Sequence, residues 1–266
     1  MQSSADLFSL TGRTALVTGA TGHLGTVMGW ALARAGAHVL VNSRCSRRAG
    51  ALVEAMRAEG LAASPAVFDL TDSTRRGAAS VLFADQPLHI LVNNAYAGGA
   101  GTIGASSADA YRESYDIAVV AAHDLLIGAL PALRLAVRRD GDASVINIAS
   151  MYGSVSPDPR VYAAPEAVNP PFYGAAKAAL IQWSRYAACE FGREGIRVNS
   201  LSPGPFPAPA VQAGSPEFVA ALAAKVPMGR VGSAEEIGGP LLFLASPAAS
   251  FVNGTNLVVD GGWTAW

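Results

Sequence analysis

The sequence predicts an α/β protein, a doubly wound parallel sheet with helices on both faces, folded as a single domain over residues 1–266. Short apolar runs with the composition of buried strands alternate with helical segments along the whole length. Hydrophobic residues make up 51% of the chain and charged residues 15%, which is enough apolar surface for a large core. No internal repeat and no linker rich in serine, glycine or proline divides the chain, so one sheet accommodates all of it.

The amino-terminal elements form the first strand–helix–strand unit. Residues 14–18 have the composition of a short buried strand, which runs into a glycine-rich turn at 19–25. We expect an apolar helix over about 26–35, ended by Gly36, and a second strand at 38–42. Glycines at such a turn let a pyrophosphate approach the free N–H groups of the helix, although a glycine cluster alone is also compatible with an ordinary turn. The second strand favours the phosphate-binding interpretation.

A tyrosine and a lysine stand four residues apart in a later segment of helical composition. Because residues i and i+4 share one helix face, the ammonium of Lys177 can lie beside the phenol of Tyr173. We expect this cation to lower the pKa of the tyrosine from about 10 towards neutrality, so that the phenol can give or take a proton. The pair alone is weak evidence, and its meaning depends on the segments around it.

These segments together resemble the short-chain dehydrogenase/reductase family, of the single-domain type, from about Thr11 to Gly262. The matches occur in the family's order: the turn from Thr18-Gly19 to Gly25, Asp69 within 68–72, Asn93-Asn94-Ala95, Ser150 after the strand 146–149, the pair Tyr173 and Lys177, Pro203-Gly204 after the strand 196–202, and 259–262. The resemblance implies a Rossmann-like fold and hydride transfer between a nicotinamide and a carbonyl or secondary alcohol.

The resemblance also implies roles for single residues. Tyr173 would be the acid or base, Lys177 would lower its pKa and hold the nicotinamide ribose, and Ser150 would donate a hydrogen bond to the substrate oxygen. Ser150 is otherwise a strand-end hydroxyl, and Asn94 a turn residue. The residues implied to bind the cofactor are Gly19, Thr21, His23, Leu24, Ser43, Arg44, Asp69, Leu70, Asn94, Ala95, Tyr173, Lys177, Pro203 and Gly204.

The end of the second strand indicates which cofactor is bound. An NAD-selective enzyme places Asp or Glu there to bind the ribose 2′-hydroxyl. Here Ser43 and Arg44 stand at that place, and a hydroxyl and a guanidinium favour a 2′-phosphate. We therefore expect NADP(H) in preference to NAD(H). The alternative is that Arg44, with Arg47 and Arg48, only forms the solvated start of a helix.

Three positions depart from the family pattern by substitution. His23 stands where a glycine of the turn usually lies, and Tyr96 replaces the glycine after Asn-Asn-Ala, where it could cover the nicotinamide, line the substrate pocket or cap the sheet. Ala118 takes the place of an asparagine that, in the family, helps to hold a helix distortion and a water that passes protons to the lysine. Because backbone carbonyl groups largely hold that water, the substitution need not abolish the relay.

A fourth departure is an enlarged loop between the proposed catalytic serine and tyrosine, which are 23 positions apart. The segment 154–172 contains five prolines, so we expect an irregular, stiff loop that passes over the substrate side. We expect a second substrate loop at 204–227.

Composition argues against several other kinds of protein. The net charge is −1 with scattered basic residues, which argues against a nucleic-acid surface. The most apolar helix is interrupted by His123, Asp124 and Pro131, so we expect no membrane span, and the first residues lack a secretory signal. Cys45 and Cys189 have no metal-ligand spacing, so we expect no metal and a cytoplasmic location.

The resemblance further implies a homo-oligomer, commonly a tetramer, with contacts through the helices that begin near Ser107 and Tyr173. We expect Trp263 and Trp266 to pack against a neighbouring subunit, because a monomer would have difficulty covering both. Two other functions stay open: a cofactor-binding sensor or scaffold with little turnover, and a dehydratase or epimerase that acts through a transient ketone. The complete Ser–Tyr–Lys set argues against the sensor.

Overall fold

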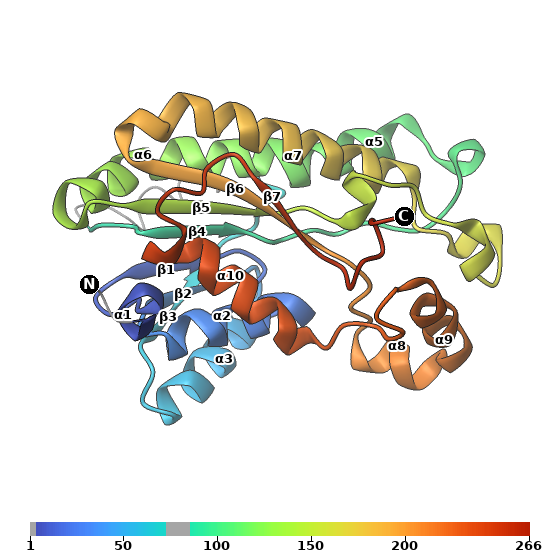
Figure 1. Ribbon diagram of the computed structural model, residues 1–266, viewed down its shortest axis with the longest axis horizontal. Helices are drawn as coiled ribbons and strands as arrows, with labels where there is room; N and C mark the ends of the chain where they lie inside the picture. Colours follow the sequence, from blue (N-terminus) through green and yellow to red (C-terminus); the bar gives the residue numbers. More distant parts are fainter. Residues whose placement is uncertain (1–3, 73–85) are drawn as a thin grey trace.

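The structure, a computed structural model, describes residues 4–72 and 86–266 (Figure 1). One seven-stranded sheet has the order β3-β2-β1-β4-β5-β6-β7, and all its strand pairs are parallel. The strands are β1 Thr14–Val17, β2 His38–Ser43, β3 Ala63–Val67, β4 Ile90–Asn93, β5 Ala143–Ile148, β6 Ile196–Pro203 and β7 Asn256–Val259. The strand order reverses at β1 and β4, and the crevice outside the carboxyl ends of these strands is where such sheets bind ligands.

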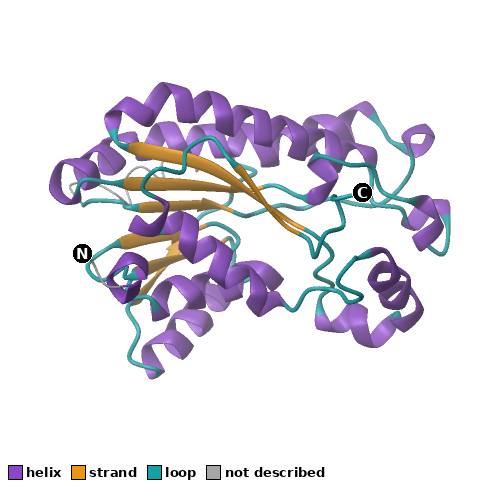
Figure 2. Cartoon of the chain, viewed as in Figure 1, coloured by secondary structure: helices purple, strands orange, loops and turns teal. Residues whose placement is uncertain are grey.

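Helices cover both faces of this sheet, as expected for a doubly wound domain (Figures 1 and 2). One layer contains α2 His23–Arg34, α3 Ser46–Ala58 and α10 Gly238–Ala245, and the other contains α5 Ala108–Tyr115, α6 Ala121–Asp140 and α7 Pro171–Phe191. The short helices are α1 Ser4–Phe8, α8 Pro209–Gly214 and α9 Pro216–Lys225. Helices α8 and α9 lie beyond the carboxyl edge of the sheet, within the predicted substrate loop 204–227. The predicted fold class is confirmed.

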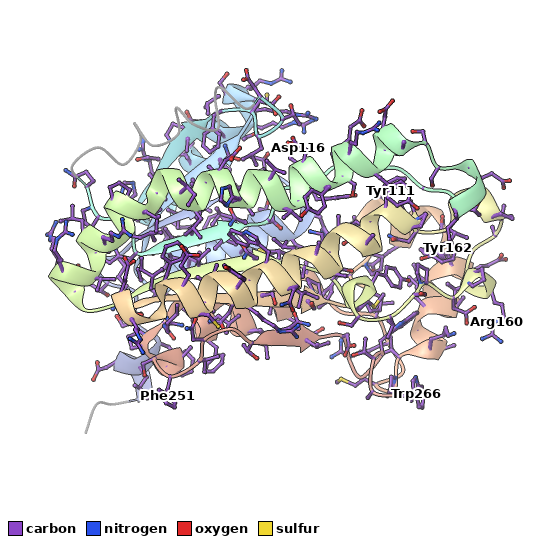
Figure 3. All side chains as sticks on the ribbon, turned by 90° about the horizontal axis from the view of Figure 1, so that it is seen from above. Tyr111, Asp116, Arg160, Tyr162, Phe251 and Trp266 are labelled. Carbon is purple, nitrogen blue, oxygen red and sulfur yellow. The ribbon has the colours of Figure 1, made fainter. Side chains whose placement is uncertain are left out.

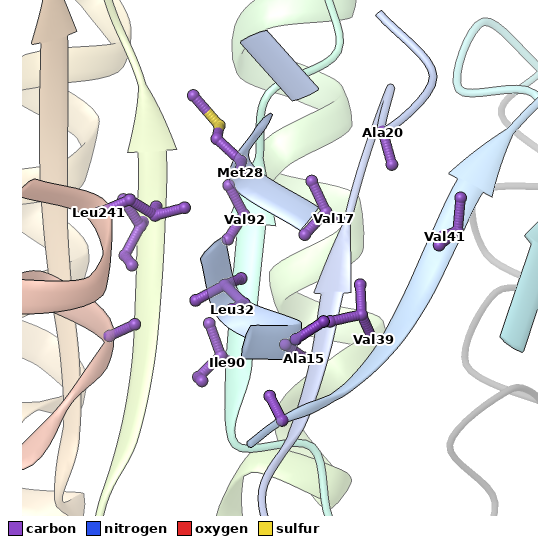
Figure 4. Packing of buried hydrophobic residues seen from close by; sticks show 14 of the residues in the cluster. Ala15, Val17, Ala20, Met28, Leu32, Val39, Val41, Ile90, Val92 and Leu241 are labelled. Carbon is purple, nitrogen blue, oxygen red and sulfur yellow. The ribbon is translucent and has the colours of Figure 1, made fainter. Parts of the chain in front are cut away.

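The core gives the site a rigid platform. Between the sheet and the first helix layer, Val17 and Val92 pack against Met28 and Leu32 of α2 and Leu241 of α10, all fully buried (Figure 4). Each such apolar side chain contributes about 1.5–3 kcal/mol through burial. Every residue of β5 and β6 is buried, as expected for central parallel strands covered on both faces.

Helix α2 begins at His23, three residues earlier than predicted, and ends at Arg34. Gly22 already takes the extended conformation of an N-cap residue, with φ −85° and ψ 175°, so the helix starts directly after it. Gly19 has φ +59°, and a Cβ at Gly25 would overlap the carbonyl oxygen of Gly19. The turn is therefore tight because of these two glycines, and His23 is tolerated because its position has ordinary helical geometry.

A single helical run extends over Ala108–Asp140, in which the five residues Asp116–Val120 form a π-turn between α5 and α6. The expected interruptions do not end the run, and Pro131 lies inside α6. By length and composition the run is apolar enough to cross a membrane, but 56% of its most apolar window is buried within the protein. Its burial against the sheet accounts for its apolar character.

The segment 154–172 is irregular, as predicted, and contains two single-turn 3-10 helices that begin at Pro159 and Pro165. Helix α7 then begins at Pro171, because proline at the first helical position loses no intrahelical hydrogen bond. Arg160 and Tyr162 of this segment lie at the end of the molecule next to α9 (Figure 3).

The prediction for the two carboxyl-terminal tryptophans is wrong for Trp263. This side chain is 7% exposed and packs in its own subunit, in a cluster with Tyr152, Val161 and Leu222. Trp266 is 82% exposed and lies at the surface (Figure 3). Sequence reasoning could not foresee that α9 and the 154–172 segment cover Trp263, since this contact joins three segments that are distant in the sequence.

Candidate active site

One cleft of about 590 Å³ opens at the carboxyl ends of the central strands. Every residue predicted to act in catalysis or to bind the cofactor lines it: Gly19, Thr21, His23, Leu24, Ser43, Arg44, Asp69, Leu70, Asn94, Ala95, Ser150, Tyr173, Lys177, Pro203 and Gly204. The cleft also contains residues that sequence reasoning did not assign to it, namely Asn42, Arg48, Phe68, Ile117 and Phe206. Their only signal in the sequence is their position beside the predicted segments.

Two asparagines hold the glycine-rich turn in place. The Oδ1 of Asn42 accepts from the N–H of Gly19 at 3.1 Å, and its Nδ2 donates to the carbonyl groups of Ala66 and Phe68 at 3.0 and 3.2 Å. Asn94 donates from Nδ2 to the carbonyl groups of Thr18 and Gly19 at 2.9 and 3.3 Å. The amide of Asn94 thus acts on the turn, and its predicted contact with the nicotinamide stays a prediction.

The end of β2 presents hydroxyl and guanidinium groups to the cleft. The buried hydroxyl of Ser43 accepts from Thr21 Oγ1 at 3.1 Å and from the N–H of Cys45 at 3.2 Å, so its own proton is what it can offer to a ligand. Arg44 and Arg48 line the same region. Asp69 also lines the cleft, and its Oδ1 accepts from the N–H and hydroxyl of Thr71 at 3.0 and 2.9 Å.

The proposed catalytic side chains come together at the other end of the cleft. Ser150 follows β5 and accepts from the N–H of Tyr152 at 3.1 Å, while Tyr173 and Lys177 lie on the first turns of α7. The Nζ of Lys177 donates to the carbonyl oxygen of Ile148 at 2.6 Å and lies 5.6 Å from the centre of the Tyr173 ring. Helix α7 thus places both groups beside the end of β5.

The expected lowering of the tyrosine pKa is not found in this structure. Burial raises the pKa of the Tyr173 phenol, whereas a hydrogen bond with Ser150 lowers it and the nearby Tyr96 raises it further. Burial also lowers the pKa of Lys177 to about 7, because the side chain is 3% exposed. Helical spacing alone gave the wrong direction because burial of the phenol has the largest effect on the Tyr173 pKa, and a local pattern does not contain burial.

Tyr96 packs directly against the proposed catalytic pair, Tyr173 and Lys177. Its ring is edge-on to that of Tyr173, with centroids 4.9 Å apart, and its hydroxyl lies 2.7 Å from the Oγ of Ser114. The Nζ of Lys177 lies 5.0 Å from the centre of the Tyr96 ring. Of the roles considered for Tyr96, the structure supports a wall of the cleft beside Tyr173.

The helix distortion survives without the asparagine. Ala118 is 4% exposed and lies in the π-turn Asp116–Val120, at the point where the family's asparagine would stand. His123, more than one turn further along, is exposed, and its ring lies edge-on to that of Trp183 with centroids 6.2 Å apart. The backbone can therefore adopt the π-turn with alanine at this position.

Apolar and aromatic groups pack against Tyr173 on the side of the predicted substrate loops. Tyr173 borders the cluster that contains Tyr152, Leu222 and Trp263. The hydroxyl groups of Tyr152 and Tyr162 lie 3.0 Å apart. An ion pair joins the two predicted substrate loops, because Asp158 of the 154–172 segment binds Lys225 at the end of α9. The two loops are thus connected to each other beside the site.

The cleft fits a dinucleotide with a nicotinamide end. Because Gly19 and Gly25 have no side chains, the glycine turn leaves the N-terminus of α2 open to the cleft. An open helix N-terminus is the kind of site that binds a pyrophosphate. On one side of this turn the cleft is lined by the arginines, and on the other side by Ser150, Tyr173 and Lys177. Fold and site together define a nicotinamide-dependent oxidoreductase of the single-domain, doubly wound class.

Comparison with known proteins agrees with this class. The family model described as Enoyl-(Acyl carrier protein) reductase matches residues 19–264. The chain is 35% identical to gluconate 5-dehydrogenase of Gluconobacter oxydans over 266 residues, which covers 98% of each chain. The chain belongs to the short-chain dehydrogenase/reductase family, whose members are NAD(P)-dependent oxidoreductases.

Solved structures show the same fold in complexes with a cofactor. The gluconate 5-dehydrogenase of Burkholderia cenocepacia J2315, in complex with NADP and tartrate, has a TM-score of 0.86 and 31% identity, with 99% of this chain and 100% of that chain covered. The Pseudomonas aeruginosa RhlG/NADP active-site complex has a TM-score of 0.86 and 30% identity, with 97% and 98% covered. Relatives at 35% identity are named for different substrates, gluconate 5-dehydrogenase and the galactitol 2-dehydrogenase of Cereibacter sphaeroides among them, so the family alone does not identify the substrate of this chain.

Proposed function

We propose that this protein is an NADP(H)-preferring carbonyl reductase or alcohol dehydrogenase that uses Tyr173 as its acid and base. One observation carries the proposal: Ser150, Tyr173 and Lys177 converge at one end of a cleft whose other end is lined by Arg44 and Arg48. A sensor or scaffold has no need for the converged catalytic set.

The arrangement accounts for both directions of the reaction. The nicotinamide, when bound, supplies or accepts the hydride at the substrate carbon. During reduction Tyr173 gives its phenolic proton to the substrate oxygen, and during oxidation the phenolate takes it back. Ser150 donates a hydrogen bond to that oxygen as negative charge develops on it. Protonated Lys177 stabilises the phenolate that Tyr173 becomes.

The preference for NADP(H) is supported by the end of β2. Arg44 and Arg48 bring two positive charges to the cleft, and the Ser43 proton can bind a phosphate oxygen. No Asp or Glu follows β2 directly, so a 2′-phosphate meets no repulsion there. The NADP complexes of the two solved relatives support the same assignment.

We further propose that the substrate is an uncharged carbonyl compound with an apolar substituent. The groups around Tyr173 are Tyr96 and the apolar cluster with Tyr152 and Trp263. The nearby charged groups pair among themselves, since Asp158 binds both Lys225 and Arg160. The 154–172 segment would then be an enlarged loop that closes the substrate end.

The test is oxidation of NADPH, followed by its absorbance, with uncharged aliphatic and aromatic ketones and with 5-ketogluconate as the charged comparison. We expect kcat/KM to be at least about tenfold higher for the best uncharged ketone, which corresponds to about 1.4 kcal/mol. Binding of NADPH without oxidation by any compound would contradict the enzyme assignment. Faster reduction of 5-ketogluconate would contradict the substrate assignment alone. Product analysis separates net reduction from epimerisation or dehydration.

We propose a homotetramer in the cytoplasm. Tyr111 and Tyr115 are 37% and 49% exposed and line an open groove between α5 and α7, together with Phe172 and Ala176. Figure 3 shows Tyr111 on α5, beside α7. A two-fold contact through these helices would cover the groove. Both cysteines are free thiols, which suits a reducing compartment.

A further inference from the structure

A chain of hydrogen bonds between buried polar side chains lies beside the active site and ends at an oxygen that can only accept. The hydroxyl of Ser184 donates to the carbonyl oxygen of Leu180 at 2.7 Å, so it accepts from Asn147 Nδ2 at 2.8 Å. Asn147 Oδ1 therefore accepts from Asn93 Nδ2 at 2.7 Å. Because the Leu180 carbonyl can only accept, it fixes the direction of each hydrogen bond in this chain and thereby the orientation of both side-chain amides. The Oδ1 of Asn93 is left as a buried acceptor with no protein partner.

This acceptor and the catalytic lysine border the same small cavity. The cavity has a volume of about 10 Å³ and is lined by Asn93, Lys177, Thr18 and Ala118, with apolar groups of α6 and α7 around them. This volume is about that needed for one water molecule. Lys177 also lines the cofactor cleft, so it lies between the cleft and the cavity.

The lysine has donors to spare. Its ammonium group carries three N–H bonds, and the carbonyl oxygen of Ile148 takes one of them. The titratable groups that face it are the phenols of Tyr173 on its own helix and Tyr96 on the loop after β4. A single water in this space would satisfy both the spare donor of Lys177 and the unpaired acceptor of Asn93. This matters because a buried polar group without a hydrogen bond costs about 1–3 kcal/mol.

We propose that Asn93 is a positioning residue for catalysis, which holds a single water against the ammonium of Lys177 in the cavity beside Ala118. The proposal rests on the function proposed for Lys177. The water accepts from Nζ and donates to Asn93 Oδ1, so it favours the protonated lysine and thereby the phenolate of Tyr173. The hydrogen-bonded chain from Leu180 to Asn93 keeps the acceptor oriented. The methyl side chain of Ala118 offers no hydrogen bond that could hold the water in its place.

The sequence offers a direct test because it contains two lysines, Lys177 and Lys225. In protein labelled with 13C at lysine Cε, NMR gives one titration curve for each, without cofactor or substrate, and Lys225→Arg assigns them. We expect the Lys177 midpoint to fall by at least about half a pH unit in Asn93→Leu, where the acceptor is lost. Ala118→Val fills the cavity and leaves the amide chain intact, and it should lower the same midpoint.

The matched control is Ser144→Ala, which also removes one buried hydrogen bond from the central sheet, that to the Leu244 carbonyl at 2.9 Å, away from the cavity. It should leave the Lys177 midpoint unchanged. In the active protein, the pH profile of kcat/KM for alcohol oxidation should move to higher pH in both cavity variants. A crystal structure should show one water bonded to Asn93 Oδ1 and Lys177 Nζ.

An unchanged Lys177 midpoint in a folded cavity variant would overturn the proposal, as would an equal shift in Ser144→Ala. Since Ala118→Val does not touch the amide chain, it decides the question if Asn93→Leu fails to fold. The titration needs no turnover, so it tests the inference even if the proposed reaction is not found. Conversely, turnover with an unchanged midpoint would refute only the inference.

Discussion

The ring of Tyr96 stands edge-on to the ring of Tyr173, with centroids 4.9 Å apart and an angle of 72° between the planes. The Tyr96 hydroxyl pairs with Ser114, and burial raises the pKa of the Tyr96 phenol, so this tyrosine stays neutral beside the catalytic one. An aromatic side chain where the family has glycine thus supports the orientation of Tyr173. Its ring also lies against the ammonium group of Lys177, whose Nζ is 5.0 Å from the ring centre.

Tyr173→Phe removes the proposed proton donor and keeps the ring. We expect kcat to fall by at least about 10³-fold, within the range that general acid–base catalysis contributes, with nearly unchanged binding of NADPH. Lys177→Ala should reduce both turnover and cofactor affinity, because the ammonium serves the phenol and the ribose. Steady-state kinetics and NADPH fluorescence titration measure the two effects. A Tyr173→Phe variant with near-native kcat would disprove the mechanism.

Arg44→Asp should reverse the cofactor preference. A carboxylate repels a 2′-phosphate and accepts from a free 2′-hydroxyl, so NADPH should bind more weakly and NADH more tightly. Competing titrations of the two cofactors against the parent and the variant provide the measurement. Arg160→Asp, at an exposed position in the substrate loop, is the control for charge alone and should leave the preference as it is. A parent protein that prefers NADH would contradict the assignment.

Ala118→Asn restores the residue common in the family. Because the π-turn is already present with alanine, we expect kcat to change by less than about tenfold, or ~1.4 kcal/mol. The introduced amide would take over hydrogen bonding in the cavity beside Lys177. Kinetics with the best ketone test this expectation. A much larger gain would mean that the natural protein is catalytically impaired, which favours the sensor.

Lys177→Met should stabilise the cofactor-free protein in a pH-dependent way. Burial lowers the pKa of Lys177 to about 7, so between that value and its unfolded pKa of about 10.4 the unfolded state binds more protons. Stability of the parent therefore rises with pH across this window, and the destabilisation by the lysine is complete below it. In urea unfolding, the gain from Lys177→Met should be larger at pH 6.5 than at pH 9.5 by about 1–3 kcal/mol. An equal gain at both values would show that the lysine is not desolvated.

The two carboxyl-terminal tryptophans should respond differently to substitution. Trp263→Ala removes a side chain buried in its own subunit and should lower the free energy of unfolding by about 3–5 kcal/mol. Trp266→Ala should leave the folded subunit unaffected and weaken the assembly, as light scattering over a dilution series would report. Unchanged mass and activity in Trp266→Ala would refute a role of this residue in assembly.

Much of the site was predictable because the relevant signals are local. Helical spacing brings Tyr173 and Lys177 to one face, and strand ends deliver Ser43, Ser150 and Pro203 to one edge of a parallel sheet. The glycine turn was recognisable from its place between an apolar strand and an apolar helix. The start of α2 was missed by three residues, because Gly22 rather than Gly25 ends the extended turn.

The sequence by itself determined the fold class, the order of its elements and the set of residues that meet in the cleft, because period, glycine placement and strand-end position are properties of neighbouring residues. Only the tertiary structure decided the direction of the Tyr173 pKa, the internal position of Trp263 and the meeting of Asn93 with Lys177 at one cavity. These depend on burial and on contacts between elements far apart in the chain. Desolvation acts on a group through everything packed around it, and no local pattern contains that information.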